Sequence, residues 1–444
     1  MKLSIETRDA PVGTPLRGAL TGCQPGSQVN IQAVLKDMSG ESWTAQASFA
    51  ADAGGKIELA TSPSLSGSFA GVDPHGLFWT AQPKNADTRL ADILLRRVAG
   101  GLAPKLDMLS PLEFDLTATE VSTGEIVTDV LVRRRLPSGV EQSRLPAPLC
   151  GLLFEPKHPN GAGIVLLGGS EGGVFPGRAA LLAASGFTAI ALAYFDYPGR
   201  PQGALNLPLS YFRDALTWLR DRSDVQRAGL LGVSRGSEAA QLTAINWPDL
   251  VDALVLWVPT HLRHGEINLS GGQDFMEPRG AMWSLSGRPI PGIEFTKEDR
   301  SKNKALMGDF LTAGGRRYRE IYERAWAQTA AQDYRIPIEQ YPGPTLAVGG
   351  ADDALWPSDI GATRIIEAAR KSNKTAELLV CPSAGHLIGT PGEPRPFPYV
   401  MHWTEGYMGV ENGFCAYGGT PEGAATAALQ SWATKLNFLQ THLC

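Results

Sequence analysis

Paired cysteines, long apolar runs and an excess of basic charge are all missing from this sequence of 444 residues. The five cysteines are scattered and form no CxxC pair, so we expect reduced thiols rather than disulfides. No stretch approaches the roughly 20 consecutive apolar residues that a membrane helix needs. Residues 1–7 become charged too early for a signal peptide. These absences predict a cytoplasmic protein with no membrane partner.

Charge and glycine patterning exclude further classes. Charged residues make up only 19% of the chain, the formal net charge is -5, and no basic patch occurs, so nucleic acid is not an expected partner. The glycine-rich stretch 167–173 lacks both G-x-G-x-x-G and a G-K-[ST] ending, which argues against a phosphate loop. No set of side chains forms a convincing metal site. We therefore expect neither a cofactor nor a metal.

The length of the chain favours two domains, and its predicted secondary structure changes character near residue 135. Up to about residue 135, short alternating strands such as 29–35 and 45–49 are separated by turn-rich segments, which predicts an antiparallel β-sandwich. No cluster in this part looks catalytic. Residues 136–444 form the second predicted domain.

The second domain alternates buried strands with amphipathic helices. Helical periodicity is evident after Pro208 and again from Ala425 to Leu439. This alternation predicts an α/β fold with a parallel sheet covered on both faces. The expected strands are 163–167, 187–193, 230–233, 253–258, 345–348 and 377–380.

Residues from about 261 to 342 interrupt this alternation of strands and helices. The segment is rich in glycine, proline and charge, and it contains one helical piece near 316–328. We interpret it as an insertion that lies over the sheet and covers the active site.

The sequence around Ser234 fits the pattern G-x-S-x-G, with Gly232 and Gly236 as its glycines. An apolar strand precedes it and an alanine-rich helix follows, as in the tight strand-to-helix turn that exposes a nucleophilic serine. A capping serine in an ordinary turn is the alternative. The context favours Ser234 as a nucleophile.

A serine hydroxyl needs a base and an acid, which follow it along the chain in this fold. His386 comes after the last apolar strand, where a loop can carry it over the serine. Two adjacent carboxylates, Asp352 and Asp353, follow the strand before that. The spacing from Gly350 favours Asp353 as the acid, and Asp352 is then a turn or cap residue.

The oxyanion of such a reaction needs two backbone N–H donors. One is expected from Arg235, the residue after the nucleophile, at the start of a helix. The second should come from the turn after the first core strand, where we favour Ser170 and take Gly169 as the second choice.

Several ordered blocks resemble the acyl-CoA thioesterase / bile acid-CoA:amino acid N-acyltransferase family (BAAT) along nearly the whole chain. The blocks are residues 67–79, 186–197, 207–212, 232–238, 350–353, 385–386 and 417–421. The resemblance implies an N-terminal immunoglobulin-like β-sandwich joined to a C-terminal α/β-hydrolase domain that acts on acyl thioesters. It also implies a distinction by nucleophile, because the thioesterases carry serine at the elbow and the amino-acid conjugating enzyme carries cysteine.

Ser234 therefore favours an acyl thioester hydrolase with a Ser234–His386–Asp353 triad and an acyl-serine intermediate. One alternative is acyl transfer to an amine or alcohol, for which Arg235 or arginines of the insertion could hold an acceptor carboxylate. The other is carboxylester hydrolysis. A binding or scaffold protein with an inactive hydrolase fold is disfavoured, since all three members of the triad are present. The expected partner is an acyl thioester carried by CoA or a carrier protein.

Overall fold

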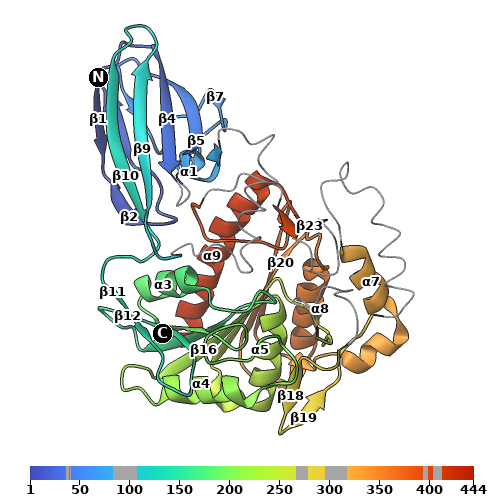
Figure 1. Ribbon diagram of the computed structural model, residues 1–444. Coiled ribbons are helices and arrows are strands. Elements are labelled where there is room, and N and C mark those ends of the chain that lie inside the picture. Colours follow the sequence, from blue (N-terminus) through green and yellow to red (C-terminus); the bar gives the residue numbers. More distant parts are fainter. Residues whose placement is uncertain are drawn as a thin grey trace.

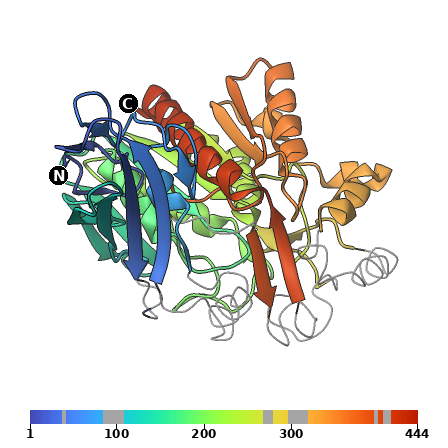
Figure 2. The same cartoon turned by 90° about the horizontal axis from the view of Figure 1, so that it is seen from above.

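The computed structural model describes residues 1–36, 40, 42–83, 108–266, 279–295, 318–393, 399–403 and 413–444. Figure 1 shows a β-rich N-terminal part beside a larger part in which helices surround a sheet. The view in Figure 2 places the N-terminal strands together on one side of the molecule.

The N-terminal part consists of two β-sheets around one core. The smaller sheet has the order β1-β3-β6, and the larger has the order β2-β10-β9-β4-β5-β7, with β8 also paired to β5. Every second side chain of β4 is buried, because side chains alternate between the two faces of a strand. This confirms the predicted sandwich, although β2 pairs with β10 in parallel and not in the antiparallel sense expected. The immunoglobulin-like assignment stays a prediction. The elements are β1 (Lys2–Ile5), β2 (Asp9–Pro11), β3 (Gly18–Thr21), β4 (Gln28–Lys36), β5 (Ser42–Ala50), β6 (Ile57–Glu58), β7 (Ser66–Gly67), α1 (Gly76–Trp79), β8 (Gln82–Pro83), β9 (Leu112–Glu120) and β10 (Ile126–Arg134).

The second part is built on an eight-stranded sheet with the order β11-β12-β14-β13-β16-β17-β20-β21. Strands β11 and β12 are antiparallel to their neighbours, and from β14 onward all pairings are parallel. The strands are β11 (Val140–Arg144), β12 (Gly151–Pro156), β13 (Ala162–Leu167), β14 (Thr188–Leu192), β16 (Arg227–Val233), β17 (Ala253–Trp257), β20 (Thr345–Gly350) and β21 (Ala376–Cys381). The six strands predicted for this domain are all present. The domain boundary at about residue 135 stays a prediction.

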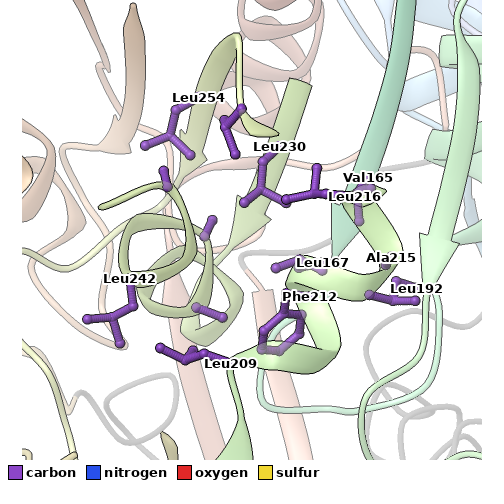
Figure 3. Packing of buried hydrophobic residues seen from close by; sticks show 14 of the residues in the cluster. Val165, Leu167, Leu192, Leu209, Phe212, Ala215, Leu216, Leu230, Leu242 and Leu254 are labelled. Atoms are coloured by element: carbon purple, nitrogen blue, oxygen red, sulfur yellow. The ribbon is translucent and has the colours of Figure 1, made fainter. Parts of the chain in front are cut away.

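Helices cover both faces of this sheet, which is why its central strands are apolar throughout. Alternate residues of β13 enter different cores: Val165 and Leu167 join one, Ile164 and Leu166 the other. Figure 3 shows the first core, where Phe212 of α4 packs near Leu167. Helices α4, α5 and α8 contribute to the first core, and α3 and α9 to the second. The helices are α3 (Pro176–Ala184), α4 (Ser210–Arg220), α5 (Arg235–Asn246), α8 (Ser358–Lys371) and α9 (Pro421–Leu443).

The chain between β17 and β20 leaves the sheet, as the predicted insertion requires. Its helix α7 (Arg319–Ala327) lies within the helical piece expected near residues 316–328. The other elements outside the main sheet are β15 (Leu207–Pro208), η1 (Pro248–Leu250), β18 (Trp283–Leu285), β19 (Arg288–Ile290), η3 (Thr329–Tyr334), η4 (Ile338–Gln340), β22 (Tyr399–Trp403) and β23 (Gly413–Gly418). Among the described residues, no helix combines the length and apolar character needed to cross a bilayer.

Candidate active site

Ser234 sits in the turn between strand β16 and helix α5, with a φ of 51° and a ψ of -121°. A non-glycine residue rarely adopts a positive φ, so the surrounding structure must hold it there. The glycines on either side of Ser234 have no room for a side chain. A Cβ on Gly232 would lie 2.3 Å from the carbonyl oxygen of Gly236, and a Cβ on Gly236 would lie 2.1 Å from that of Gly168. Both elbow glycines are therefore sterically required, in agreement with the G-x-S-x-G interpretation.

The three residues predicted as a triad lie within hydrogen-bonding distance of one another. His386 Nε2 is 2.9 Å from Ser234 Oγ, and His386 Nδ1 is 2.8 Å from Asp353 Oδ2. With Nδ1 protonated, the ring donates to the carboxylate and leaves Nε2 to accept the serine proton. Asp353 is completely buried, and the other two side chains are nearly so. The arrangement brings together residues from three loops at the carboxyl ends of β16, β20 and β21.

The two adjacent carboxylates have different surroundings. Asp353 Oδ1 accepts hydrogen bonds from the backbone N–H groups of Leu355 (2.9 Å) and Trp356 (3.2 Å), which leaves Oδ2 facing His386. Asp352 Oδ2 instead accepts from the N–H of Gly419 at 3.0 Å. Asp352 therefore joins the loop between β20 and α8, which we call the acid loop, to the turn before α9. This position is consistent with the turn role predicted for it.

The glycine-rich turn after β13 approaches Ser234 through Gly169. A Cβ on Gly169 would lie 3.2 Å from Ser234 Cβ, and the Tyr194 hydroxyl holds the turn by donating to the carbonyl oxygens of Gly168 (2.7 Å) and Gly169 (3.2 Å). Ser170 is partly buried in the same turn. The Arg235 amide is the first of helix α5 and has no acceptor within its own helix. The oxyanion roles of Arg235, Ser170 and Gly169 stay predictions.

Glu171 is a residue of this turn that the sequence analysis did not identify. Although the residue as a whole is exposed, its carboxylate turns inward: a Cβ on Gly169 would lie 2.6 Å from Glu171 Oε2. Desolvation of this carboxylate raises the pKa of Glu171, and the nearby positive charge of Arg178 only partly opposes the shift. The signal available in the sequence was a lone carboxylate inside a run of glycines.

The Arg235 side chain is not available to hold an acceptor, and that expectation is wrong. Its guanidinium is 1% exposed. It donates to Glu238 Oε1 at 2.5 Å and to the carbonyl oxygens of His264 and Gly265 at 2.9 and 2.8 Å. The positive charge of Arg235, the residue after Ser234, is thus compensated inside the protein.

Arg178 of helix α3 is a second residue that the sequence analysis missed. Its Nη2 donates to the carbonyl oxygen of Ile388, two residues beyond His386, at 3.2 Å. Its guanidinium also lies over the rings of Phe175 and Trp257, at 5.0 and 4.6 Å from their centroids. The Trp257 carbonyl oxygen in turn accepts a hydrogen bond from the backbone N–H of Ser234. Arg178 therefore connects the loop of His386 with the strand end beside Ser234.

The histidine of the site is enclosed by aromatic rings. Trp356 meets His386 edge to face at a centroid distance of 5.6 Å, and Tyr417 stacks on it at 6.0 Å. The backbone N–H of His386 donates to the Tyr417 carbonyl oxygen at 2.8 Å. Within the described residues, no group of three or more His, Cys, Asp or Glu side chains could hold a metal ion.

Comparisons with known proteins extend over nearly the whole chain. Residues 14–146 match the family described as "Acyl-CoA thioester hydrolase/BAAT N-terminal region", and residues 207–444 match "BAAT / Acyl-CoA thioester hydrolase C terminal". Acyl-coenzyme A thioesterase 1 of Homo sapiens is 29% identical over 97% of this chain and 93% of its own length. Acyl-coenzyme A thioesterase 6 of Mus musculus is 30% identical, with the same two coverages.

Among solved structures, an α/β-hydrolase enzyme from a Medee basin deep-sea metagenome library is similar to part of this chain. It is 16% identical, covers 56% of this chain and 84% of its own, and has a TM-score of 0.35. The family matches carry the assignment instead, because the C-terminal one alone spans more than half of the 444 residues. The two family matches, together with a relative that is 30% identical over 97% of this chain, show that the chain belongs to the BAAT / acyl-CoA thioester hydrolase family of enzymes.

Proposed function

We propose that this protein hydrolyses acyl thioesters, with acyl-CoA as the substrate class, through an acyl-serine intermediate on Ser234. The observation that carries the proposal is the continuous hydrogen-bonded chain from Ser234 through His386 to Asp353. The names of the relatives, which are acyl-coenzyme A thioesterases, support the substrate class.

In the first half of the reaction, Ser234 Oγ attacks the thioester carbonyl while His386 Nε2 takes its proton. The carbonyl oxygen becomes an oxyanion, which we expect the amides of Arg235 and of the Gly169–Ser170 turn to stabilise. Asp353 keeps His386 in the required tautomer and stabilises its positive charge. The thiolate leaves with little acid assistance because thiols are acidic, and it takes up the proton from His386 Nε2 as it departs. The acyl group stays on Ser234, and His386 is again neutral.

In the second half, water takes the place of the thiol. His386 removes a proton from the water, which attacks the acyl-serine carbonyl, and the same amides hold the second oxyanion. Collapse of this intermediate returns the proton to Ser234 and releases the free acid. An amine acceptor would have to compete with water for an oxyester, which is less reactive toward amines than the thioester of a cysteine enzyme.

The test measures thiol release from a panel of acyl-CoAs of different chain length, with and without glycine or taurine. We expect free acid as the main product by mass spectrometry, and a rate that does not depend on the amino acid. If N-acyl amino acid predominates at millimolar acceptor, the protein is a transferase. No thiol release from any acyl-CoA would contradict the substrate class.

The Ser234→Ala variant tests the nucleophile. Because triad residues act as a unit, turnover should fall by roughly 10⁴-fold or more while the fold is kept. Ser237→Ala is a matched control on the same helix, since the Ser237 hydroxyl is buried and has no hydrogen-bond partner within the described chain. Normal turnover in Ser234→Ala would refute the mechanism.

A further inference from the structure

A buried group of polar side chains lies directly behind the nucleophile elbow. It consists of Arg235, Glu238, His264, Trp283 and Trp326, and we call it the Glu238 network. Glu238 is completely buried, Arg235 is 1% exposed and His264 is 3% exposed. None of these side chains takes part in the bond-breaking steps described above.

Glu238 is the acceptor at the centre of the network. Its Oε1 accepts from Arg235 Nη1 at 2.5 Å and from His264 Nδ1 at 3.2 Å. Its Oε2 accepts from Trp283 Nε1 at 3.1 Å and from the backbone N–H of His264 at 3.2 Å. Burial alone would raise the pKa of Glu238, but the charge of Arg235 and the bonds from His264 outweigh it and lower the pKa. Glu238 is therefore ionised, and each of its two carboxylate oxygens accepts two hydrogen bonds.

Arg235 is held from two directions at once. Its Nη1 is bound by Glu238, one turn further along the same helix, and its Nη2 by the carbonyl oxygens of His264 and Gly265. These carbonyls belong to the chain that leaves the sheet after β17. Because the backbone N–H of Arg235 is the proposed oxyanion donor, fixing this side chain also restricts the position of the donor.

His264 extends the network to the insertion. Its Nε2 accepts from Trp326 Nε1 of helix α7 at 2.9 Å, so Nε2 is unprotonated and Nδ1 donates to Glu238. Burial lowers the pKa of His264, in keeping with this neutral form. The His264 ring is also 5.8 Å from Trp356, the ring that meets His386 edge to face.

Helix α7 is fixed at its other end to the acid loop. The backbone N–H groups of Tyr318 and Arg319 both donate to the carbonyl oxygen of Ala354, which follows Asp353, at 2.9 and 3.0 Å. Helix α7 therefore connects the loop of the triad acid with the network behind the nucleophile. In Figure 1 it stands beside α8, outside the sheet.

A buried ion pair that only filled space would be a poor solution, since apolar residues of similar volume usually stabilise a core at least as well. The other buried side chains of α5 are mostly small or apolar, and the charged pair occurs only at its first turn, next to Ser234. Oxyanion donors must lie within a few tenths of an ångström of their best position to be effective. Packing alone therefore does not explain the buried ion pair, whereas the need to fix the oxyanion donor does.

We propose that Glu238 is a positioning residue that holds the oxyanion donor of Arg235, and that His264 and Trp326 extend this control to helix α7. The proposal rests on the proposed acyl-serine mechanism. It predicts that damage to the network weakens transition-state binding while ground-state binding of the acyl chain stays the same.

The experiment compares wild type with Glu238→Gln and Trp326→Phe. For each protein we would measure kcat and KM for an acyl-CoA, the inhibition constant of an acyl trifluoromethyl ketone, and the affinity of a non-hydrolysable acyl-CoA thioether. The ketone forms a tetrahedral oxyanion on the serine, whereas the thioether reports ground-state binding. Gln241→Leu is the control, because Gln241 is another buried polar residue of α5 whose side chain bonds outside the network.

We expect kcat to fall about 100-fold in Glu238→Gln and about 10-fold in Trp326→Phe, since loss of a whole oxyanion donor costs roughly 10²–10³. The ketone should lose affinity in parallel with kcat/KM, while KM and thioether affinity change less than about threefold. Gln241→Leu should keep kcat even if its melting temperature falls. Equal losses for ketone and thioether, or an unchanged kcat in folded Glu238→Gln, would overturn the proposal.

If Glu238→Gln does not fold, Trp326→Phe decides, because it removes one N–H donor and keeps an aromatic ring. An unchanged kcat and ketone affinity in Trp326→Phe would then refute the proposal. Failure of the proposed function has a different signature: wild type itself would bind the ketone but release no thiol, or would not bind the ketone at all.

Discussion

Replacing Asp353 with asparagine changes one atom that faces His386 and leaves the rest of the acid loop in place. The N–H groups of Leu355 and Trp356 bind Oδ1 of Asp353, and the asparagine oxygen can accept both bonds. Its amide nitrogen then occupies the position of Oδ2, 2.8 Å from His386 Nδ1. An N–H donor at that point stabilises the tautomer in which Nδ1 is unprotonated and Nε2 carries the hydrogen.

In that tautomer His386 cannot accept the proton of Ser234, although all three side chains keep their places. We expect turnover to fall by about 10⁴-fold, the size of effect that the wrong tautomer produces in a serine protease triad. This corresponds to about 5 kcal/mol of transition-state stabilisation. Since the loop hydrogen bonds survive, the melting temperature should change little.

Asp352→Asn is the matched control because its carboxylate bonds to Gly419 rather than to His386. Its amide oxygen can still accept that bond, so turnover should stay within about tenfold of wild type. Both variants would be assayed by thiol release from an acyl-CoA and by the rate of labelling with a fluorophosphonate. A larger loss in Asp352→Asn than in Asp353→Asn would refute the assignment of the acid.

Two further predictions concern stability. Gly236→Ala should destabilise the fold by about 1–3 kcal/mol or more, because the new Cβ would lie 2.1 Å from a backbone oxygen. Gly177→Ala is the control and should leave the melting temperature unchanged, because the nearest atom to its new Cβ would be 3.6 Å away. Equal melting temperatures of the two variants would contradict this prediction. Burial lowers the pKa of His261 from 6.5 to about 3, so as the pH falls the unfolded chain takes up a proton at His261 before the folded protein does. The folded state therefore has its full stability above about pH 6.5 and loses stability as the pH falls toward 3. Urea unfolding should therefore show a loss of about 2 kcal/mol between pH 7.5 and 5 that His261→Gln removes and His158→Gln, at an exposed histidine, does not; the same pH dependence in both variants would contradict the prediction.

Local patterns in the sequence were enough for the elements and their order. The apolar runs of the second domain predicted its six central strands because a strand buried on both faces has no polar positions. The glycines on either side of Ser234 predicted the elbow because the close approaches there exclude any side chain. Each of these signals is formed by residues that are only a few positions apart in the sequence.

The tertiary structure decided what depends on distant segments meeting. Asp352 and Asp353 are neighbours with the same chemistry, and only the turn before α9 and the two amides of the acid loop determine which one faces His386. The sequence made the Arg235 side chain a candidate to hold an acceptor carboxylate, but the buried Glu238 and carbonyls about 30 residues away already bind it. Strand and helix periods arise from contacts between near neighbours, whereas the partners of a buried charge lie far along the chain and are brought to it only by folding.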